Sequence, residues 1–123
     1  MNLSGEAVRH VMSFYKIPLE QVVAVYDELA IDFGFVRTRV GGESAGHNGV
    51  KSIIAAAGEN FGRVRIGIGP KPHADMDTAD YVLQKFNKKE LEQMPALTRE
   101  VNAILSEYVY GSELTHETRS FLI

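Results

Sequence analysis

The spacing of apolar and polar residues along the chain predicts alternating helices and strands. Apolar residues recur at helical spacing over residues 4–15, where Ser4 is a candidate N-cap. Residues 21–26 form a nearly continuous apolar run rich in valine, which is typical of a strand buried on both faces. Residues 35–40 and 63–69 alternate between apolar and polar side chains, as strands with one solvent-exposed face do.

The other predicted elements are helical. Residues 50–57 indicate a short helix, and residues 78–84 indicate one or two helical turns. Asn87 is placed to begin a longer helix, which Pro95 is expected to kink or divide. The tail that runs to Ile123 is expected to be loosely attached. The alternation of helices with strands favours an α/β sheet.

Composition limits the class of protein. At 123 residues, with 45% hydrophobic and 24% charged side chains, the chain has the size and composition of one globular domain, which we expect to span residues 1–123. Without cysteine it has no disulfide and no thiolate metal site. No apolar run is long enough to span a bilayer, and no signal peptide is recognisable, so we expect a cytoplasmic protein with no membrane partner.

The charge distribution indicates a polyanionic partner more clearly than the net charge of −3 does. Residues 35–69 form a basic island, in which basic side chains outnumber the acidic Glu43 and Glu59. Such an island can bind phosphates. The alternative is that these charges only solvate the faces of strands and a helix. The basic residues of the island are Arg37, Arg39, Lys51, Arg63 and Arg65.

A glycine-rich loop, residues 41–49 with the sequence GGESAGHNG, contains the most suggestive polar pair. The Asn48 amide could stabilise a developing oxyanion or an activated water, or it could cap the following helix. His47 could act as a general base, or it could serve in hydrogen bonding and packing. Asn2 offers another amide near a helix start, with the same two interpretations.

Asp27 follows the first predicted strand and is the sharpest single candidate. A carboxylate at the carboxyl end of a buried strand lies where open α/β sheets place their ligand crevices. There it could orient an imidazole and stabilise its charged form. A helix-capping or loop-ordering role is an equal alternative.

Other motifs carry less weight. Gly67 and Gly69 resemble a dinucleotide fingerprint only superficially, because Pro70 follows and no third glycine opens a helix. His73 and the nearby aspartates are expected to be solvent-exposed, so we expect no metal site. The chain has no nucleophile elbow, Walker loop or zincin motif.

The motifs, in their order and spacing, resemble the bacterial peptidyl-tRNA hydrolase family. The resemblance extends over nearly the whole chain up to about Leu105. The segments that carry it are Met1-Asn2-Leu3-Ser4-Gly5-Glu6, Tyr15-Lys16-Ile17-Pro18, Tyr26-Asp27-Glu28-Leu29, Gly46-His47-Asn48-Gly49, Arg65-Ile66-Gly67-Ile68-Gly69 and Asp80-Tyr81-Val82-Leu83.

The resemblance implies an esterase that cleaves the bond between a nascent peptide and tRNA, without metal or cofactor. It implies a catalytic histidine held by an aspartate that matches Asp27. It also implies that Asn2 and Asn48 position substrate and water, and that His47 and Met1 lie at the substrate. The residues that it implies contact the tRNA acceptor arm are Arg37, Arg39 and Arg65, with the basic Lys51 beside them.

One part of the family pattern has no counterpart in this sequence. Family members begin with a central strand, a Gly-Asn-Pro-Gly loop and a segment that bears the catalytic histidine. We therefore expect a partial α/β fold, a mixed sheet flanked by helices but missing the amino-terminal central strand. We expect such a truncated chain to hydrolyse peptidyl-tRNA poorly, and to pair with itself or with the missing amino-terminal segment. The alternatives are a tRNA-binding module without catalysis and an inactive fragment.

Overall fold

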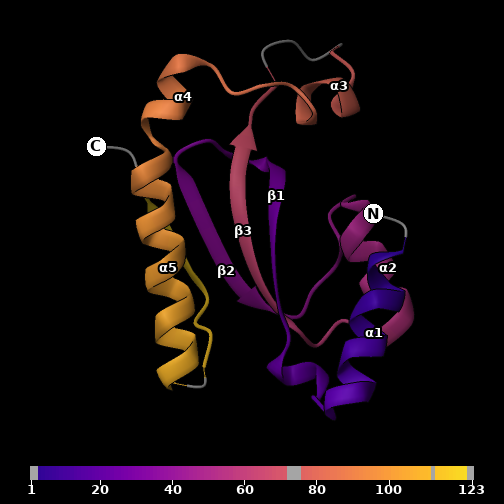
Figure 1. Ribbon diagram of the computed structural model, residues 1–123. Helices are drawn as coiled ribbons and strands as arrows, with labels where there is room; N and C mark the ends of the chain where they lie inside the picture. The colour runs from indigo at the N-terminus through magenta and orange to yellow at the C-terminus, as the bar shows by residue number, and fades with distance from the viewer. Residues whose placement is uncertain (1–2, 72–75, 112, 122–123) are drawn as a thin grey trace.

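The computed structural model describes residues 3–71, 76–111 and 113–121. Helices and strands alternate in the first part of the chain, and helices dominate the second (Figure 1). A short 3₁₀ turn follows the first helix. The elements are α1 (Ser4–Tyr15), the 3₁₀ turn (Leu19–Gln21), β1 (Val23–Asp32), β2 (Phe35–Val40), α2 (Asn48–Ala57), β3 (Gly62–Gly69), α3 (Thr78–Val82), α4 (Lys88–Glu92), α5 (Met94–Gly111) and β4 (Glu117–Ser120).

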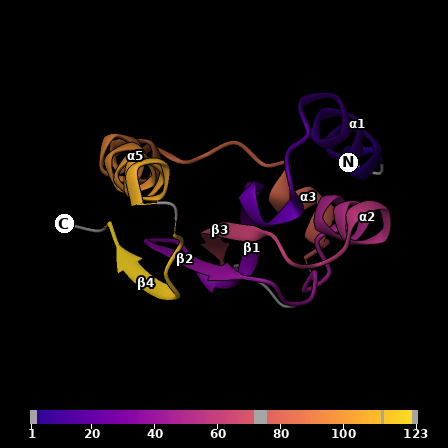
Figure 2. The same cartoon turned by 90° about the horizontal axis from the view of Figure 1, so that it is seen from below.

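The strands form one mixed sheet in the order β1-β3-β2-β4. β1 runs parallel to β3, whereas β2 is antiparallel to both β3 and β4. α5 lies along one face of this sheet, and α1 and α2 lie together on the other side (Figures 1 and 2). The prediction of an α/β fold with a mixed sheet flanked by helices is therefore confirmed.

Each face of the sheet has its own hydrophobic core. On the α5 side, Val36 and Val64 pack with Ile104. On the α2 side, Val50 and Ile53 surround the fully buried Phe61. The alternation read from residues 35–40 and 63–69 divides the side chains of β2 and β3 between these two faces.

β1 differs from its prediction in length and in position. It begins at Val23 and continues through Asp27 to Asp32, so Asp27 lies within the strand and not at its end. β1 is also an edge strand of the sheet, with Val25 45% exposed, so the prediction of a strand buried on both faces is wrong. A valine-rich run indicates a strand, but its place in the sheet depends on its partners.

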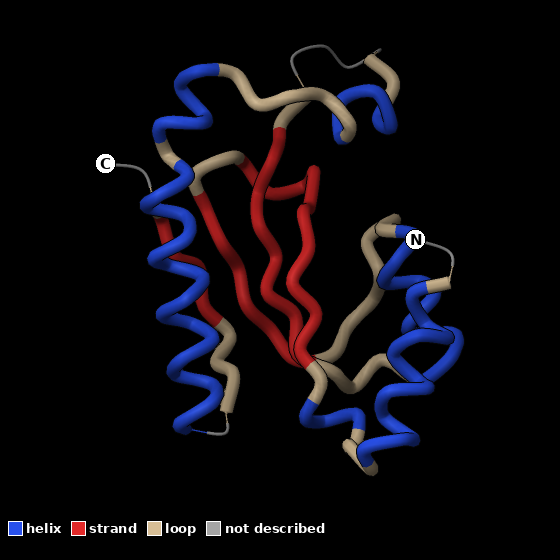
Figure 3. Tube along the Cα trace, in the orientation of Figure 1, coloured by secondary structure: helices blue, strands red, loops and turns tan. Residues whose placement is uncertain are grey.

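The end of β1 passes closely over β3, and the paired glycines of β3 allow this (Figure 3). A Cβ atom on Gly67 would lie 2.1 Å from the carbonyl oxygen of Asp32, and one on Gly69 would lie 2.0 Å from that of Leu29. Any side chain at either position would clash with backbone. This close approach of two strands accounts for glycine at both positions, so the two glycines need no dinucleotide-binding role.

The helix boundaries follow local signals for the most part. Asn87 and Glu90 form the expected capping box at the start of α4. The helical region around Pro95 is divided as predicted, because α4 ends at Glu92 and α5 begins at Met94. Ser4 is not the N-cap of α1, since Leu3 occupies that position without a side-chain hydrogen bond.

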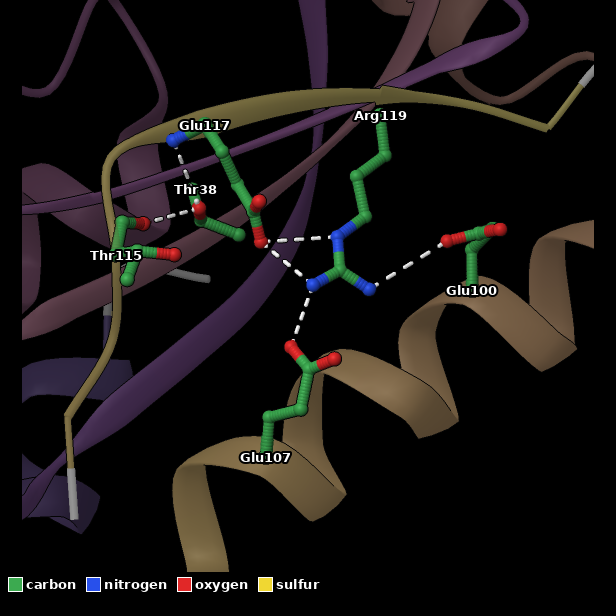
Figure 4. Close-up of polar contacts among 6 residues, drawn as sticks. All are labelled: Thr38, Glu100, Glu107, Thr115, Glu117 and Arg119. Atoms are coloured by element: carbon green, nitrogen blue, oxygen red, sulfur yellow. Dashed lines mark hydrogen bonds and ion pairs between the residues drawn. The ribbon is translucent and has the colours of Figure 1, made fainter. Parts of the chain in front are cut away.

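The chain after α5 is not loosely attached as far as the structure describes it. β4 pairs with β2, and Phe121 beyond it is only 4% exposed and packs edge-to-face on Phe33. Arg119 of β4 forms ion pairs with carboxylates of β4 and α5 (Figure 4). The apolar Phe121 and this ion-pair network together hold the tail against the sheet and helix. The carboxylates are those of Glu100, Glu107 and Glu117.

Within the three described segments, none of the helices is both long enough and apolar enough to cross a membrane.

Candidate active site

Asp27 and His47 face each other across the edge of the sheet. His47 Nε2 lies 3.5 Å from Asp27 Oδ1, a polar contact longer than a strong hydrogen bond. The His47 side chain is 15% exposed and that of Asp27 is 39% exposed, so the pair is accessible from the carboxylate side. The imidazole also packs against the Tyr26 ring, with a centroid separation of 4.8 Å.

The first turn of α2 sets the protonation pattern of His47. His47 is the N-cap of α2, and its Nδ1 accepts a hydrogen bond of 3.2 Å from the Val50 amide. A neutral imidazole that accepts at Nδ1 carries its proton at Nε2. The protonated Nε2 then faces Asp27 at 3.5 Å, and in this tautomer neither ring nitrogen is free to accept a proton from water.

This capping arrangement shows that one of the two interpretations of Asn48, the N-cap of the following helix, is wrong. Asn48 is the first residue of α2 rather than its N-cap, and it is exposed. It does not line the cavity that contains Asp27. Among the described residues, the structure therefore brings His47 to Asp27, but neither His47 nor Asn48 lines that cavity.

Asp27 lines a cavity of about 580 Å³ between the ends of the strands and the α3–α4 segment. The cavity combines apolar walls from Phe33 and Phe86 with polar groups from Asn87 and Glu90. Polar and apolar groups contribute to its lining in similar measure, so it offers a ligand both apolar contact and groups that fix its orientation. This one is large enough for several amino-acid residues of a substrate.

Tyr81 holds α3 over this cavity. Its hydroxyl donates a hydrogen bond to the carbonyl oxygen of Ile68 near the end of β3. Burial raises the pKa of Tyr81, and the nearby Glu90 carboxylate raises it further. A tyrosine hydroxyl is protonated at neutral pH in any case, and these two effects keep Tyr81 protonated, and this hydrogen bond intact, to more alkaline pH.

The arginines of the basic island gather on the β2–β3 pair. Arg37 lies opposite Arg65 and Arg39 lies opposite Arg63 in the antiparallel ladder. Arg37, Arg39 and Arg65 line a groove of about 280 Å³ beside β4. Like charges directly opposite each other repel, which favours an anion in the groove, although Glu28 already offsets part of the Arg65 charge. Lys51, on the exposed face of α2, lines neither this groove nor the cavity beside Asp27.

Glu28 and Tyr26 were not singled out from the sequence, although they contact the candidate site. Glu28 is 8% exposed and forms a 3.4 Å ion pair with Arg65, its neighbour on the adjacent strand. Tyr26 contacts His47. Tyr26 precedes Asp27 in the sequence and Glu28 follows it. Their partners could not be identified from the sequence, because that requires the register of β1 against β3.

Several predicted residues lie outside the described segments. Met1 and Asn2 are among them, and so are His73 and Asp75 of the polar loop. Among the residues that are described, no group of histidine and carboxylate side chains is arranged to hold a metal ion.

Comparisons of this chain with a family model, with curated proteins and with solved structures all match the same family. A family model described as peptidyl-tRNA hydrolase matches residues 1–121. The peptidyl-tRNA hydrolase of Lachnoclostridium phytofermentans is 48% identical over 91 residues, which cover 73% of this chain and 47% of that protein. The one from Staphylococcus epidermidis is 39% identical over 122 residues, which cover 98% of this chain and 64% of that protein.

The solved structures agree with the fold. A crystal structure of peptidyl-tRNA hydrolase from Acinetobacter baumannii superposes with a TM-score of 0.81 and 33% sequence identity. The superposition covers 91% of this chain and 57% of that one. The chain thus spans about half to two thirds of the length of these three relatives.

Proposed function

Because the chain belongs to the peptidyl-tRNA hydrolase family, we propose that its site takes part in cleaving the ester bond between a peptide and tRNA. The observation that carries this proposal is that Asp27 both lines the cavity and contacts His47 outside it. In hydrolases a carboxylate recurrently orients the group that takes up the proton. Asp27 is placed for that role, whereas both ring nitrogens of His47 are already engaged. Asp27 is partly exposed at this cavity, so an ester carbonyl and its attacking water could both reach the carboxylate there.

The basic island is proposed to bind the phosphates of the tRNA acceptor arm. Arg37, Arg39 and Arg65 share one groove. An arginine fork binds phosphate through paired N–H donors. The cavity that Asp27 lines then serves the peptide side of the substrate. Lys51 extends the positive surface along α2, and Met1, Asn2 and Asn48 remain proposed substrate contacts.

Asp27 is proposed to orient the attacking water, while a proton acceptor other than His47 removes its proton. This is supported by the hydrogen bond that His47 Nδ1 accepts from the Val50 amide and by the 3.5 Å polar contact between His47 Nε2 and Asp27. General-base catalysis typically contributes about 100- to 10,000-fold to the rate. We therefore propose that the 123-residue chain alone turns over slowly, and that a chain limited to binding tRNA is the second candidate function.

The experiment is single-turnover hydrolysis of peptidyl-tRNA by the purified chain and by the Staphylococcus epidermidis relative. We expect the chain to bind with salt-dependent affinity and to hydrolyse at least about 100-fold more slowly than the relative. Asp27→Asn should abolish the residual rate, while His47→Gln should reduce it only partly. A rate equal to that of the relative, lost in His47→Gln, would show that His47 is the base. Salt-independent binding without hydrolysis would reject both candidate functions.

We also propose that the free edge of β1 pairs with a further strand. Among the described residues, β1 pairs only with β3, so its outer edge presents unpaired backbone groups beside the exposed Val25. The added strand would come from a second copy of the chain or from the family's amino-terminal region. Sedimentation that shows a monomer up to about 100 μM, combined with no binding of an amino-terminal family peptide, would rule this out.

A further inference from the structure

Arg63 is the most deeply buried charged side chain of the candidate site. It lies on β3, has no exposed surface, and stacks its guanidinium 3.9 Å from the centroid of the Phe61 ring. Among the described residues, no carboxylate forms an ion pair with it. A buried cation is costly unless hydrogen bonds satisfy it. Both Nη atoms of Arg63 are hydrogen-bonded, whereas its buried Nε has no hydrogen-bond partner among the described residues.

Those partners are backbone carbonyl groups on both sides of α2. Arg63 Nη2 donates 2.8 Å to the carbonyl of Gly42, and Nη1 donates 3.1 Å to that of Glu43, both in the glycine-rich loop that precedes α2. Nη2 also donates 3.0 Å to the carbonyl of Glu59, just beyond α2. One guanidinium thus fastens both ends of the segment that carries His47 to the sheet.

The loop itself is shaped to reach this guanidinium. Gly42 has a φ of +106°, a conformation that residues with side chains rarely adopt. A Cβ atom there would lie 2.3 Å from Nη2 of Arg39, so the backbone rests directly against a second arginine. The loop conformation, and with it the direction in which α2 begins, depends on these two arginines.

A second route connects Arg63 to the imidazole. Tyr26 and Arg63 line the same cavity of about 320 Å³, and the guanidinium interacts with the Tyr26 hydroxyl. The Tyr26 ring in turn packs against the His47 ring. Arg63 therefore supports His47 both through the loop backbone and through an aromatic side chain.

We infer that Arg63 is the positioning residue of the site, which holds the glycine-rich loop and the start of α2 so that His47 faces Asp27. It acts through backbone carbonyls and does not contact the reacting atoms. The inference rests on the proposed function for its catalytic consequence, but the positioning itself is independent of any reaction. Lysine should not substitute for arginine here, since its ammonium group cannot reproduce a planar fork that binds three carbonyls.

The test compares Arg63→Lys with Arg119→Lys. Both replace a strand arginine that makes several hydrogen bonds, but Arg119 binds carboxylates at the opposite edge of the sheet from β1 (Figure 4). The first readout is amide hydrogen exchange of Val50, whose N–H is bonded to His47 Nδ1. We expect exchange about tenfold faster in Arg63→Lys, after normalising to the core amide of Val36, and within about twofold of wild type in Arg119→Lys.

The second readout is the ¹⁵N spectrum of the His47 imidazole. In the wild type we expect an unprotonated Nδ1 and a protonated Nε2, and in Arg63→Lys a mixture of the two tautomers. A merely structural role would lower overall stability without changing the tautomer. Unchanged Val50 exchange and an unchanged tautomer in Arg63→Lys would overturn the inference.

Tyr26→Phe serves if Arg63→Lys does not fold. It removes only the hydroxyl that interacts with Arg63, and we expect a rise of about two- to threefold in Val50 exchange. No rise, in a folded Tyr26→Phe protein, would remove the aromatic route from the inference.

Kinetics separate this inference from the proposed function. If the wild type hydrolyses peptidyl-tRNA, Arg63→Lys should lower kcat about tenfold or more and change KM by less than about threefold. If the wild type does not hydrolyse it, the proposed function fails, while the exchange and ¹⁵N measurements still decide the positioning role. A raised KM with unchanged kcat would indicate that Arg63 binds substrate, against the inference.

Discussion

The buried ion pair between Glu28 and Arg65 has opposite consequences for stability and for binding. The Arg65 Nη1 and Glu28 Oε2 atoms are 3.4 Å apart, and the two side chains are 17% and 8% exposed. In Arg65→Met, the Glu28 carboxylate stays buried without its partner. We expect a loss of about 3 kcal/mol in the free energy of unfolding, the lower end of the range for breaking a buried pair, because 3.4 Å is a long contact.

Removing the other partner should instead strengthen tRNA binding. Glu28→Gln keeps the shape of the side chain but no longer neutralises Arg65, which lies in the groove with Arg37 and Arg39. One more effective cation should steepen the dependence of log affinity on log salt by about 0.9. Affinity should therefore rise most at low salt. Glu28→Gln should lose less stability than Arg65→Met, because the remaining guanidinium is the more exposed partner.

The assay is urea unfolding followed by circular dichroism, together with fluorescence anisotropy of labelled tRNA at several salt concentrations. The double variant Glu28→Gln/Arg65→Met should recover at least about 1 kcal/mol of the stability that additivity predicts it loses. Arg37→Met, at an exposed position of β2, is the stability control and should stay within about 0.5 kcal/mol of wild type. Equal stability of Arg65→Met and Arg37→Met, or no coupling in the double variant, would refute the reasoning.

Two further predictions concern the core and the tyrosine beside His47. Phe121, which is 4% exposed, packs against Phe33, and Phe121→Ala should lower the free energy of unfolding by about 3–5 kcal/mol. Urea unfolding measures this loss. A loss below about 1 kcal/mol would show that Phe121 is not part of the hydrophobic core. Burial raises the pKa of Tyr26 above its ordinary value of 10.0, although Arg63 partly opposes this, so the stability that Tyr26 contributes is complete below pH 10.0 and is lost as the pH rises toward its folded-state pKa. The decline in stability above that pH should be shallower in Tyr26→Phe, and identical slopes in the two proteins would contradict this.

Local signals in the sequence were sufficient for most of the helices and for one complete strand. The alternation over residues 35–40 gave β2 with both its ends, because a two-residue period requires only neighbouring side chains. Asn87 and Glu90 indicated the start of α4 for the same reason, since a capping box spans three residues. Gly58, directly after the predicted helix at residues 50–57, is indeed the C-cap of α2.

The candidate site depended on contacts that no local pattern contains. The sequence indicated Asp27 and His47 as separate candidates, and it left open whether each had a structural role. Only the fold brought the imidazole to the carboxylate, and only the first turn of α2 showed that Nδ1 already accepts a hydrogen bond. The proton position on His47 follows from that contact.

By itself, the sequence determined the family, the order of most elements and the basic island, because these depend on residue identity and short-range spacing. The tertiary structure alone decided that β1 and β4 are the two edge strands of the described sheet. It alone also decided that Arg63 binds the loop before His47. These features depend on pairing between residues far apart in the chain. Which distant residues pair depends on how the whole fold buries apolar side chains and satisfies backbone hydrogen bonds. Short-range spacing in the sequence contains no information about those distant partners.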